Sequence, residues 1–204
     1  GLPLAKIASR VMAGEKLSKF NLKDNSKGMY AVKEAVFPFN KFPNSDLLLG
    51  PEMKSTGEVM GFDKNFGMAF AKSQIAASNA LPTKGLAFIS LKNSHKKEGV
   101  QLAKQLIKLN FKLCGTGGTA DYINNHGIKC RKINKVNQGS PHIVEKLNKK
   151  NISLVINTTE GKDSISDSFS LRRTSLINKI PYFTTMPAAN ACLESIEALK
   201  KYPI

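Results

Sequence analysis

From residue 85 to the end of the chain, short apolar runs alternate with segments whose apolar residues recur at helical spacing. The runs have the length of buried strands, and in the first intervening segment Val100, Ala103 and Ile107 share one helical face. Strands are expected at residues 86–91, 111–115, 129–133, 153–157 and 181–185, and helices at 96–109, 119–125, 140–149, 167–178 and 187–200. Because strand and helix alternate throughout, we predict an α/β fold with a doubly wound, five-stranded parallel sheet.

A small, polar stretch at residues 77–84 separates this pattern from the first part of the chain. Its Ser, Asn, Pro and Thr residues are typical of a linker. We therefore predict a domain boundary after Pro82, with one domain at residues 1–82 and another at 83–204. The chain starts at Gly1, without Met and without the layout of a secretory signal, so we expect it to be part of something longer.

Hydroxyl, glycine and lysine residues follow four of the expected strands. They are Ser90 and Lys96 after the first, Gly115-Thr116-Gly117-Gly118-Thr119 after the second, Lys135 after the third, and Asn157, Thr158 and Thr159 after the fourth. Ligands of doubly wound sheets bind beyond the carboxyl ends of the strands, where these residues should meet. Glycines let the backbone approach an oxyanion, and the start of a helix offers unpaired N–H groups. The pattern favours a site for a nucleoside monophosphate or a small phosphate ester.

Each of these turns alone would also suit a tight strand-to-helix connection or a helix cap. The Gly-rich turn is neither a Walker loop nor a dinucleotide fingerprint, because no Gly-Lys-Ser or Gly-Lys-Thr closes it and it does not follow the first strand.

Composition and charge narrow the possible partners. The formal net charge is +16, and residues 83–204 hold 20 basic and 8 acidic residues, so polyanions must be considered. The chain has 7% aromatic residues, no zinc-finger spacing and no aromatic RNA-binding motif, so we expect that nucleic acid is not a partner. The 3 cysteines, Cys114, Cys130 and Cys192, fit neither a disulfide framework nor a metal site and point to a reducing cytoplasm. No apolar run approaches the roughly 20 residues of a membrane span, so no membrane partner is expected.

Motifs in both parts of the chain together resemble one family. They lie at residues 1–14, 32–43, 49–61, 134–136, 139–143, 156–159 and 168–173. On these motifs, residues 83–204 resemble the methylglyoxal-synthase-like regulatory domain that ends the large subunit of carbamoyl phosphate synthetases. Residues 1–82 resemble the C-terminal tail of the second ATP-grasp module, which precedes it. The resemblance implies a methylglyoxal-synthase-like fold for the five-stranded sheet, preceded by an α+β tail.

The resemblance also implies an ATP-dependent ligase of the cytoplasm. Such enzymes make carbamoyl phosphate from bicarbonate, glutamine-derived ammonia and ATP for pyrimidine and arginine synthesis. The family's residues that hold ATP and Mg (or Mn) precede the position matching Gly1, so we expect no catalytic residues, cofactor or metal in this chain alone. The implied partners are upstream modules of the same subunit, a glutaminase small subunit and an allosteric nucleotide monophosphate, UMP or IMP.

By similarity, most of the strand-end residues match positions around the effector's phosphate. These are Lys96, Thr116, Thr119, Lys135, Asn157, Thr158 and Thr159, while Ser90 and Asp167 match positions that contact the nucleoside. Glu34, Tyr182 and Thr184 match part of the family's ornithine site. Without the resemblance, Glu34 reads as a surface charge, and Tyr182 and Thr184 as residues placed on an edge strand by their β-propensity.

A free-standing methylglyoxal synthase is the alternative, because it has the same fold and a phosphate site. Its reaction needs a carboxylate as general base beside the phosphate. Glu160 and Asp163 follow the fourth strand and are candidates. The Gly-Pro-Met-Gly-Gly-Asp type of motif of that enzyme is missing here, which favours the regulatory domain.

Overall fold

The computed structural model describes residues 2–23, 28–36, 57–158, 168–202 and 204. The first part of the chain holds helix α1 (Leu4–Met12), the short 3-10 helix η1 (Leu17–Phe20), strands β1 (Tyr30–Val36) and β2 (Gly57–Asp63), and helix α2 (Phe66–Ala76). β1 and β2 pair antiparallel, from Tyr30 opposite Asp63 to Val36 opposite Gly57. Helix α2 begins where the Asn65 side chain accepts a hydrogen bond of 3.0 Å from the Met68 N–H.

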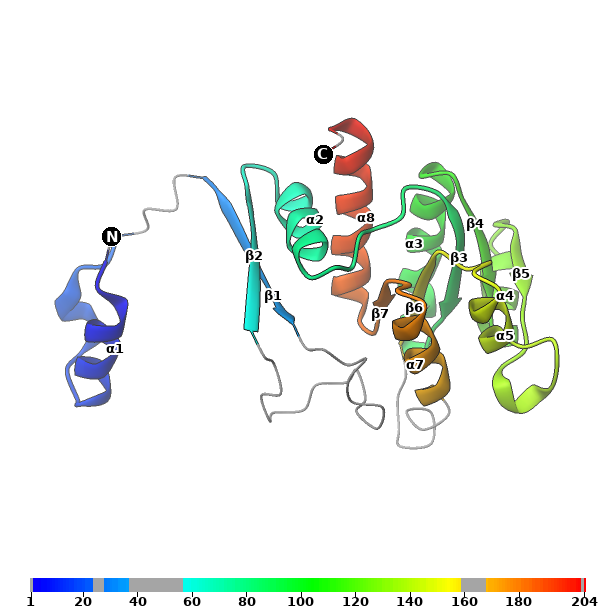
Figure 1. Ribbon diagram of the computed structural model, residues 1–204, viewed down its shortest axis with the longest axis horizontal. Coiled ribbons are helices and arrows are strands. Elements are labelled where there is room, and N and C mark those ends of the chain that lie inside the picture. Colours follow the sequence, from blue (N-terminus) through cyan, green and yellow to red (C-terminus); the bar gives the residue numbers. More distant parts are fainter. Residues whose placement is uncertain (1, 24–27, 37–56, 159–167, 203) are drawn as a thin grey trace.

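The second part alternates strands and helices. They are β3 (Gly85–Ser90), η3 (Asn93–His95), α3 (Lys96–Lys108), β4 (Phe111–Gly115), α4 (Gly117–Asn124), β5 (Cys130–Lys132), η4 (Val136–Gln138), α5 (Ile143–Asn148), β6 (Leu154–Asn157), α7 (Phe169–Ile177), β7 (Tyr182–Phe183) and α8 (Met186–Lys201). The strands form one parallel sheet in the order β5-β4-β3-β6-β7, as Figure 1 shows. The predicted five-stranded, doubly wound sheet is confirmed.

Helices cover both faces of this sheet because its strands are apolar on both sides. Ala87 and Ile89 of β3 face a core shared with α3, α4 and α8, while Phe88 between them faces a second core shared with α5 and α7. All three are fully buried. The two cores hold the strands, and with them the strand ends, between two layers of helices.

One predicted helix begins later than expected. The sequence placed a helix start at Ser140, whereas α5 begins at Ile143. The cause is a pairing across the preceding loop, since His142 forms a parallel bridge with Asn134 and stays extended at φ −113° and ψ 172°. Pro141 therefore lies in the loop before the helix.

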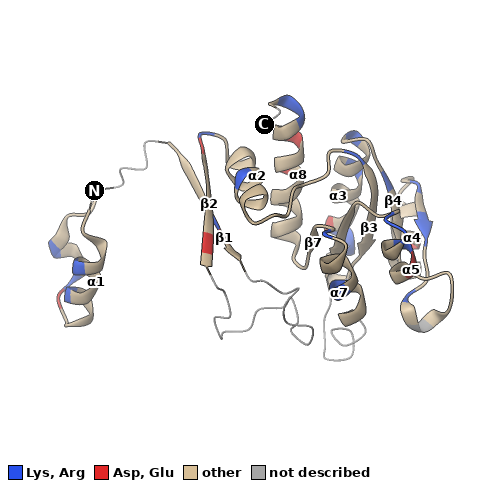
Figure 2. Ribbon diagram, in the orientation of Figure 1, with Lys and Arg blue, Asp and Glu red and all other residues tan. Residues whose placement is uncertain are grey.

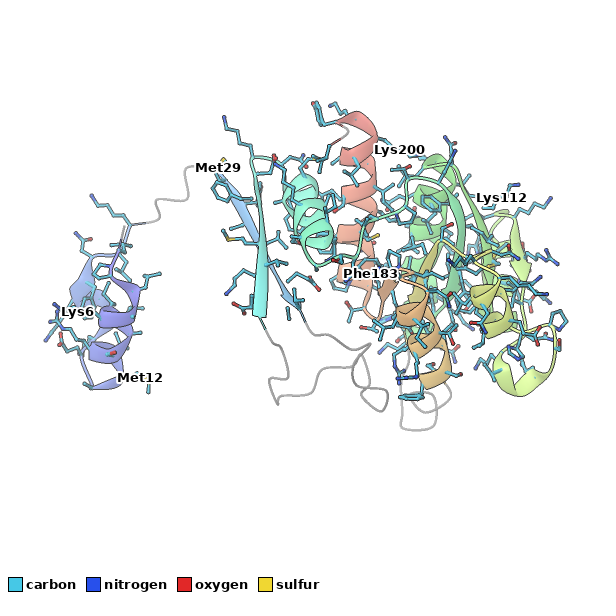
Figure 3. The ribbon with its side chains drawn as sticks, in the orientation of Figure 1. Lys6, Met12, Met29, Lys112, Phe183 and Lys200 are labelled. Atoms are coloured by element: carbon cyan, nitrogen blue, oxygen red, sulfur yellow. The ribbon has the colours of Figure 1, made fainter. Side chains whose placement is uncertain are left out.

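Helix α8 connects the two parts of the chain. It packs against α2 on one side and against α3 and β7 on the other (Figure 1). The rings of Phe70 in α2 and Phe183 in β7 lie 6.4 Å apart at this junction, where Figure 3 labels Phe183. The proposed boundary after Pro82 thus falls between two segments that pack together. No helix in the described part of the chain is both long and apolar enough to cross a membrane.

Candidate functional site

The hydroxyl groups that follow β3 and β4 form one hydrogen-bonded chain. Ser90 Oγ lies 3.2 Å from Thr116 Oγ1, and the Thr116 hydroxyl donates to Thr119 Oγ1 over 3.4 Å. Thr119 Oγ1 also accepts a bond of 3.0 Å from the N–H of Leu91, just beyond β3. Thr116 and Thr119 are 8% and 2% exposed. Ser90, Thr116 and Thr119 therefore meet at one place, although 26 residues separate Ser90 from Thr116.

Thr158 joins the same edge from β6. Its N–H donates to the Ser90 carbonyl over 2.9 Å, and the N–H of Lys92 lies 3.2 Å from both the carbonyl and the hydroxyl oxygen of Thr158. The chain runs outward from β3 through β4 to β5 and then returns to the other side of β3 as β6. Such a switch between neighbouring strands is where doubly wound folds bind ligands. Thr159 and Asp167 lie outside the described residues.

Helix α4 points its first N–H groups into this edge of the sheet. It begins at Gly117, directly after Thr116, which makes no side-chain cap. Within the described residues the N–H groups of Gly117 and Gly118 have no hydrogen-bond partner. Lys96 Nζ lies 3.4 Å from the position that a Cβ on Gly118 would take. A half-buried ammonium group beside the positive end of a helix is suited to sharing an oxyanion with it.

Lys135 approaches the same turn from the third strand. The chain after β5 stays beside the turn, because the Ile133 N–H donates to the Gly115 carbonyl over 2.9 Å. Lys135 follows two residues later and is exposed. Its backbone N–H is held by Gln138 Oε1 at 2.9 Å. Lys135 therefore stands at the rim of the strand-end site, with its backbone fixed and its side chain in solvent.

Asn157, predicted beside the phosphate, is linked to Tyr182 of the predicted ornithine-type site. Asn157 is 3% exposed at the end of β6, and its Nδ2 donates to Tyr182 Oη over 2.5 Å. The two residues lie on neighbouring strands, β6 and β7. Sequence reasoning missed this contact, because nothing in the spacing of 25 residues indicates it.

Glu34, the third residue of that ornithine-type set, is hydrogen-bonded to helix α2. Its Oε2 accepts a bond of 3.0 Å from Gln74 Nε2, and Gln74 in α2 is 4% exposed. Burial raises the pKa of the Glu34 carboxyl, and the Gln74 hydrogen bond partly offsets this. Within the described residues no hydrogen bond or ion pair joins Glu34 to Tyr182 or to the half-buried Thr184. Gln74 was not singled out from the sequence; a polar residue in an apolar helix was the available signal.

Among the described residues, the cysteines and the possible metal ligands do not form a second site. Cys114, Cys130 and Cys192 are buried and free, and burial raises the pKa of Cys114 to about 12 and that of Cys130 to about 11, so both remain thiols. No cluster of three or more metal-ligating side chains occurs where the structure describes the chain. Figure 2 shows Lys and Arg on many elements, whereas the residues that line the strand ends are mostly uncharged.

Comparison with known proteins found a family model and a solved structure that are similar to the second part of the chain. The family model of the MGS-like domain matches residues 98–184, which include α4, the Lys135 loop and Asn157. The solved structure of methylglyoxal synthase from Elizabethkingia anophelis NUHP1 matches 55% of the chain and 79% of its own chain, with a TM-score of 0.46 and 15% identity.

Two relatives match nearly the whole chain. The carbamoyl phosphate synthase large chain of Pseudomonas syringae pv. tomato is 50% identical over 198 residues, which are 97% of this chain and 18% of that protein. The "carbamoyl phosphate synthase large chain, C-terminal section" of Methanopyrus kandleri is 46% identical over 208 residues, 98% of this chain and 38% of that protein. The match extends through both parts of the chain, so a free-standing methylglyoxal synthase is not favoured. The chain is thus similar over nearly its whole length to carbamoyl phosphate synthase large chains, of which it spans less than two thirds, and its residues 98–184 match the MGS-like domain.

Proposed function

We propose that this chain is the regulatory end of a carbamoyl phosphate synthase large chain and that it binds the phosphate of a nucleoside monophosphate. The observation that carries the proposal is the position of Lys96 Nζ beside Gly118, next to two N–H groups without partners in the described part of the chain and to buried hydroxyls. Charge-assisted bonds from backbone N–H groups and an ammonium group to a phosphate are about twice as strong as hydrogen bonds between neutral groups. Ser90 would contact the nucleoside on the β3 side.

The whole protein would be the ATP-dependent ligase of the cytoplasm that supplies carbamoyl phosphate for pyrimidine and arginine synthesis. ATP, its metal ions and the glutaminase small subunit would bind to parts of the protein outside this chain. This chain alone would therefore not be catalytic. Residues 1–82 would close an ATP-grasp module and residues 83–204 would form the allosteric domain.

Regulation would follow from differential binding. An effector shifts an equilibrium only when it binds two arrangements of the protein with different affinity, typically by about 1–3 kcal/mol. The strand-end site is tied to the rest of the chain through Tyr182, β7 and the packing of α8 on α2. A ligand that reorders the strand ends would therefore also bias the position of α2 and the β1–β2 sheet.

Calorimetric titration of the chain with UMP, IMP and ornithine tests this function. We expect one nucleotide to bind with micromolar affinity, and Lys135→Ala and Thr116→Ala to weaken it about tenfold or more. Lys112→Ala is a matched control, because Lys112 is also exposed but lies in β4, away from the strand ends (Figure 3).

A nucleotide that binds equally well to wild type and to both site variants would bind elsewhere and contradict the site. A folded chain that binds neither nucleotide would contradict the proposed function of this chain. Loss of affinity in Lys112→Ala as large as in Lys135→Ala would indicate only a general attraction of anions to a basic protein.

A further inference from the structure

The carboxylate of Glu145 contacts two residues of the loop that carries Lys135. Glu145 in α5 accepts a hydrogen bond of 3.1 Å from Ser140 Oγ on its Oε2, and its Oε1 lies 3.3 Å from His142 Nε2. The other ring nitrogen of His142 is buried and has no partner within the described residues. Glu145 is therefore the polar contact that orients His142, and it also holds Ser140.

Hydrogen bonds within the same loop, residues 134–142, also hold its conformation. Asn134 Nδ2 donates to the Gly139 carbonyl over 3.2 Å, and the Asn134 carbonyl accepts the Ile143 N–H at 3.1 Å. Gly139 has φ +90°, a backbone conformation that favours glycine. Ile143 and Leu147 are 3% and 0% exposed and fix α5 to the core beneath. The loop is thus tied to α5, and α5 is tied to the sheet.

A fixed loop favours ligand binding because the Lys135 side chain is costly to order. Its side chain is long, exposed and has no ion-pair partner within the described residues. Ordering such a side chain on a ligand costs free energy, and the cost grows if the backbone must be ordered as well. A loop held in place before the ligand arrives leaves only the side chain to be ordered.

We infer that Glu145 is a positioning residue for anion binding, which acts through Ser140 and His142 to hold the Lys135 backbone at the strand-end site. This inference rests on the proposed function, because it needs an anion at that site. It predicts that removing the negative charge of Glu145 weakens the binding of an anion. Removing a negative charge near an anion site strengthens binding by Coulomb's law alone, whereas loss of positioning weakens it.

The test is a double-mutant cycle with UMP and IMP as calorimetric probes. Glu145→Ala is expected to weaken nucleotide binding about fivefold in the wild-type background and by less than about 1.5-fold in the Lys135→Ala background, because the two residues act in series. Glu145→Gln keeps an acceptor for Ser140 and is expected to restore about half of the lost binding free energy. Glu197→Ala removes the same charge from the exposed face of α8 and should not weaken binding.

Three outcomes would overturn the inference. They are unchanged or tighter binding in Glu145→Ala, an equal loss in both backgrounds, and equal losses in Glu145→Ala and Glu197→Ala. Circular dichroism of each variant shows whether the chain is folded, and Glu145→Gln supplies the comparison if Glu145→Ala is not. Absence of binding to wild type would instead defeat the proposed function, and the positioning role with it.

Discussion

The five-stranded sheet and the two-stranded sheet of this molecule obtain their burial in different ways. In the larger sheet, Ala87, Phe88 and Ile89 of the central strand are fully buried, because helices cover both faces. In the smaller one, α2 packs on one face, while Met60 and Phe62 on the other are 59% and 51% exposed. The larger sheet supplies its own core and can hold buried hydroxyls at its strand ends. The smaller sheet depends on α2 for its burial, and α2 depends on α8.

Two glycines set the spacing between β2, α2 and α8. A Cβ on Gly61 of β2 would lie 1.8 Å from the Ala69 carbonyl oxygen in α2, and one on Gly67 of α2 would lie 2.6 Å from the Glu194 carbonyl oxygen in α8. Two backbone-to-backbone contacts therefore connect β2, α2 and α8. Contacts of this kind tolerate little sliding, so a displacement of α8 would move α2 and β2 with it.

Gly61→Ala should produce the largest loss of stability, and only in the smaller sheet. The added methyl group meets backbone atoms that cannot rotate away, so we expect the β1–β2 sheet to separate from α2 at a cost of about 3 kcal/mol. Hydrogen exchange should then increase in β1 and β2 and remain slow in β3, β4 and β6.

Gly57→Ala in the same strand is the matched control, since a Cβ there has no neighbour within 4 Å among the residues that the structure describes. If both variants exchange like wild type, the close approach of β2 to α2 is wrong. If β3 and β4 lose protection together with β1 and β2, the two regions unfold as one unit.

Thr119→Val should destabilise the larger sheet instead. The hydroxyl accepts the Leu91 N–H in a site that is 2% exposed, so the valine would leave a buried N–H without a partner. We expect a loss of about 1–2 kcal/mol in the free energy of unfolding, measured by chemical denaturation. The half-buried Thr174 of α7 gives the control Thr174→Val, for which a loss below about 0.5 kcal/mol is expected. Equal losses would mean that the Thr119 bond adds nothing specific.

The larger sheet could be predicted from sequence because its information is local. Each strand is a short apolar run and each helix a periodic segment, so their order alone implied the parallel sheet, and parallel strands bring their carboxyl ends to one edge. The meeting of Ser90, Thr116 and Thr158 followed from that topology.

The features that were not predicted depend on pairings that no local pattern in the sequence indicates. Glu34 and Gln74 are 40 residues apart, and neither residue type indicates the other. The start of α5 was misplaced because His142 pairs with Asn134 across a loop, which overrides the local preference of Pro141 for a first helical turn. The packing of α2 on α8 likewise joins segments more than 100 residues apart and leaves no periodic signal.

Lys96→Met separates binding from stability. The variant keeps the apolar stem of the side chain and removes its charge beside Gly118, so UMP or IMP should bind about tenfold more weakly with little change in thermal midpoint. Lys33→Met removes a lysine of the smaller sheet, where Lys33 pairs with Glu58 at the surface, and should leave nucleotide affinity unchanged. Similar losses in both variants would show that general charge, and not the strand-end geometry, binds the nucleotide.

Glu34→Gln should give the smallest effect, with a defined dependence on pH. Because burial raises the pKa of Glu34, the folded protein keeps a proton that the unfolded chain has already lost between the ordinary glutamate pKa and the raised one. Wild-type stability should therefore fall as pH rises through that window, whereas the introduced glutamine stays neutral and can still accept a hydrogen bond from Gln74. We expect the variant to melt about 1–2 °C higher at pH 7 and to match wild type near pH 4, by differential scanning calorimetry. Glu58→Gln on the exposed face of β2 also removes a carboxylate, together with its surface ion pair to Lys33, and should not raise the midpoint at pH 7. A lower midpoint for Glu34→Gln at pH 7 would mean that the ionised carboxylate stabilises the junction between β1 and α2, contrary to the raised pKa.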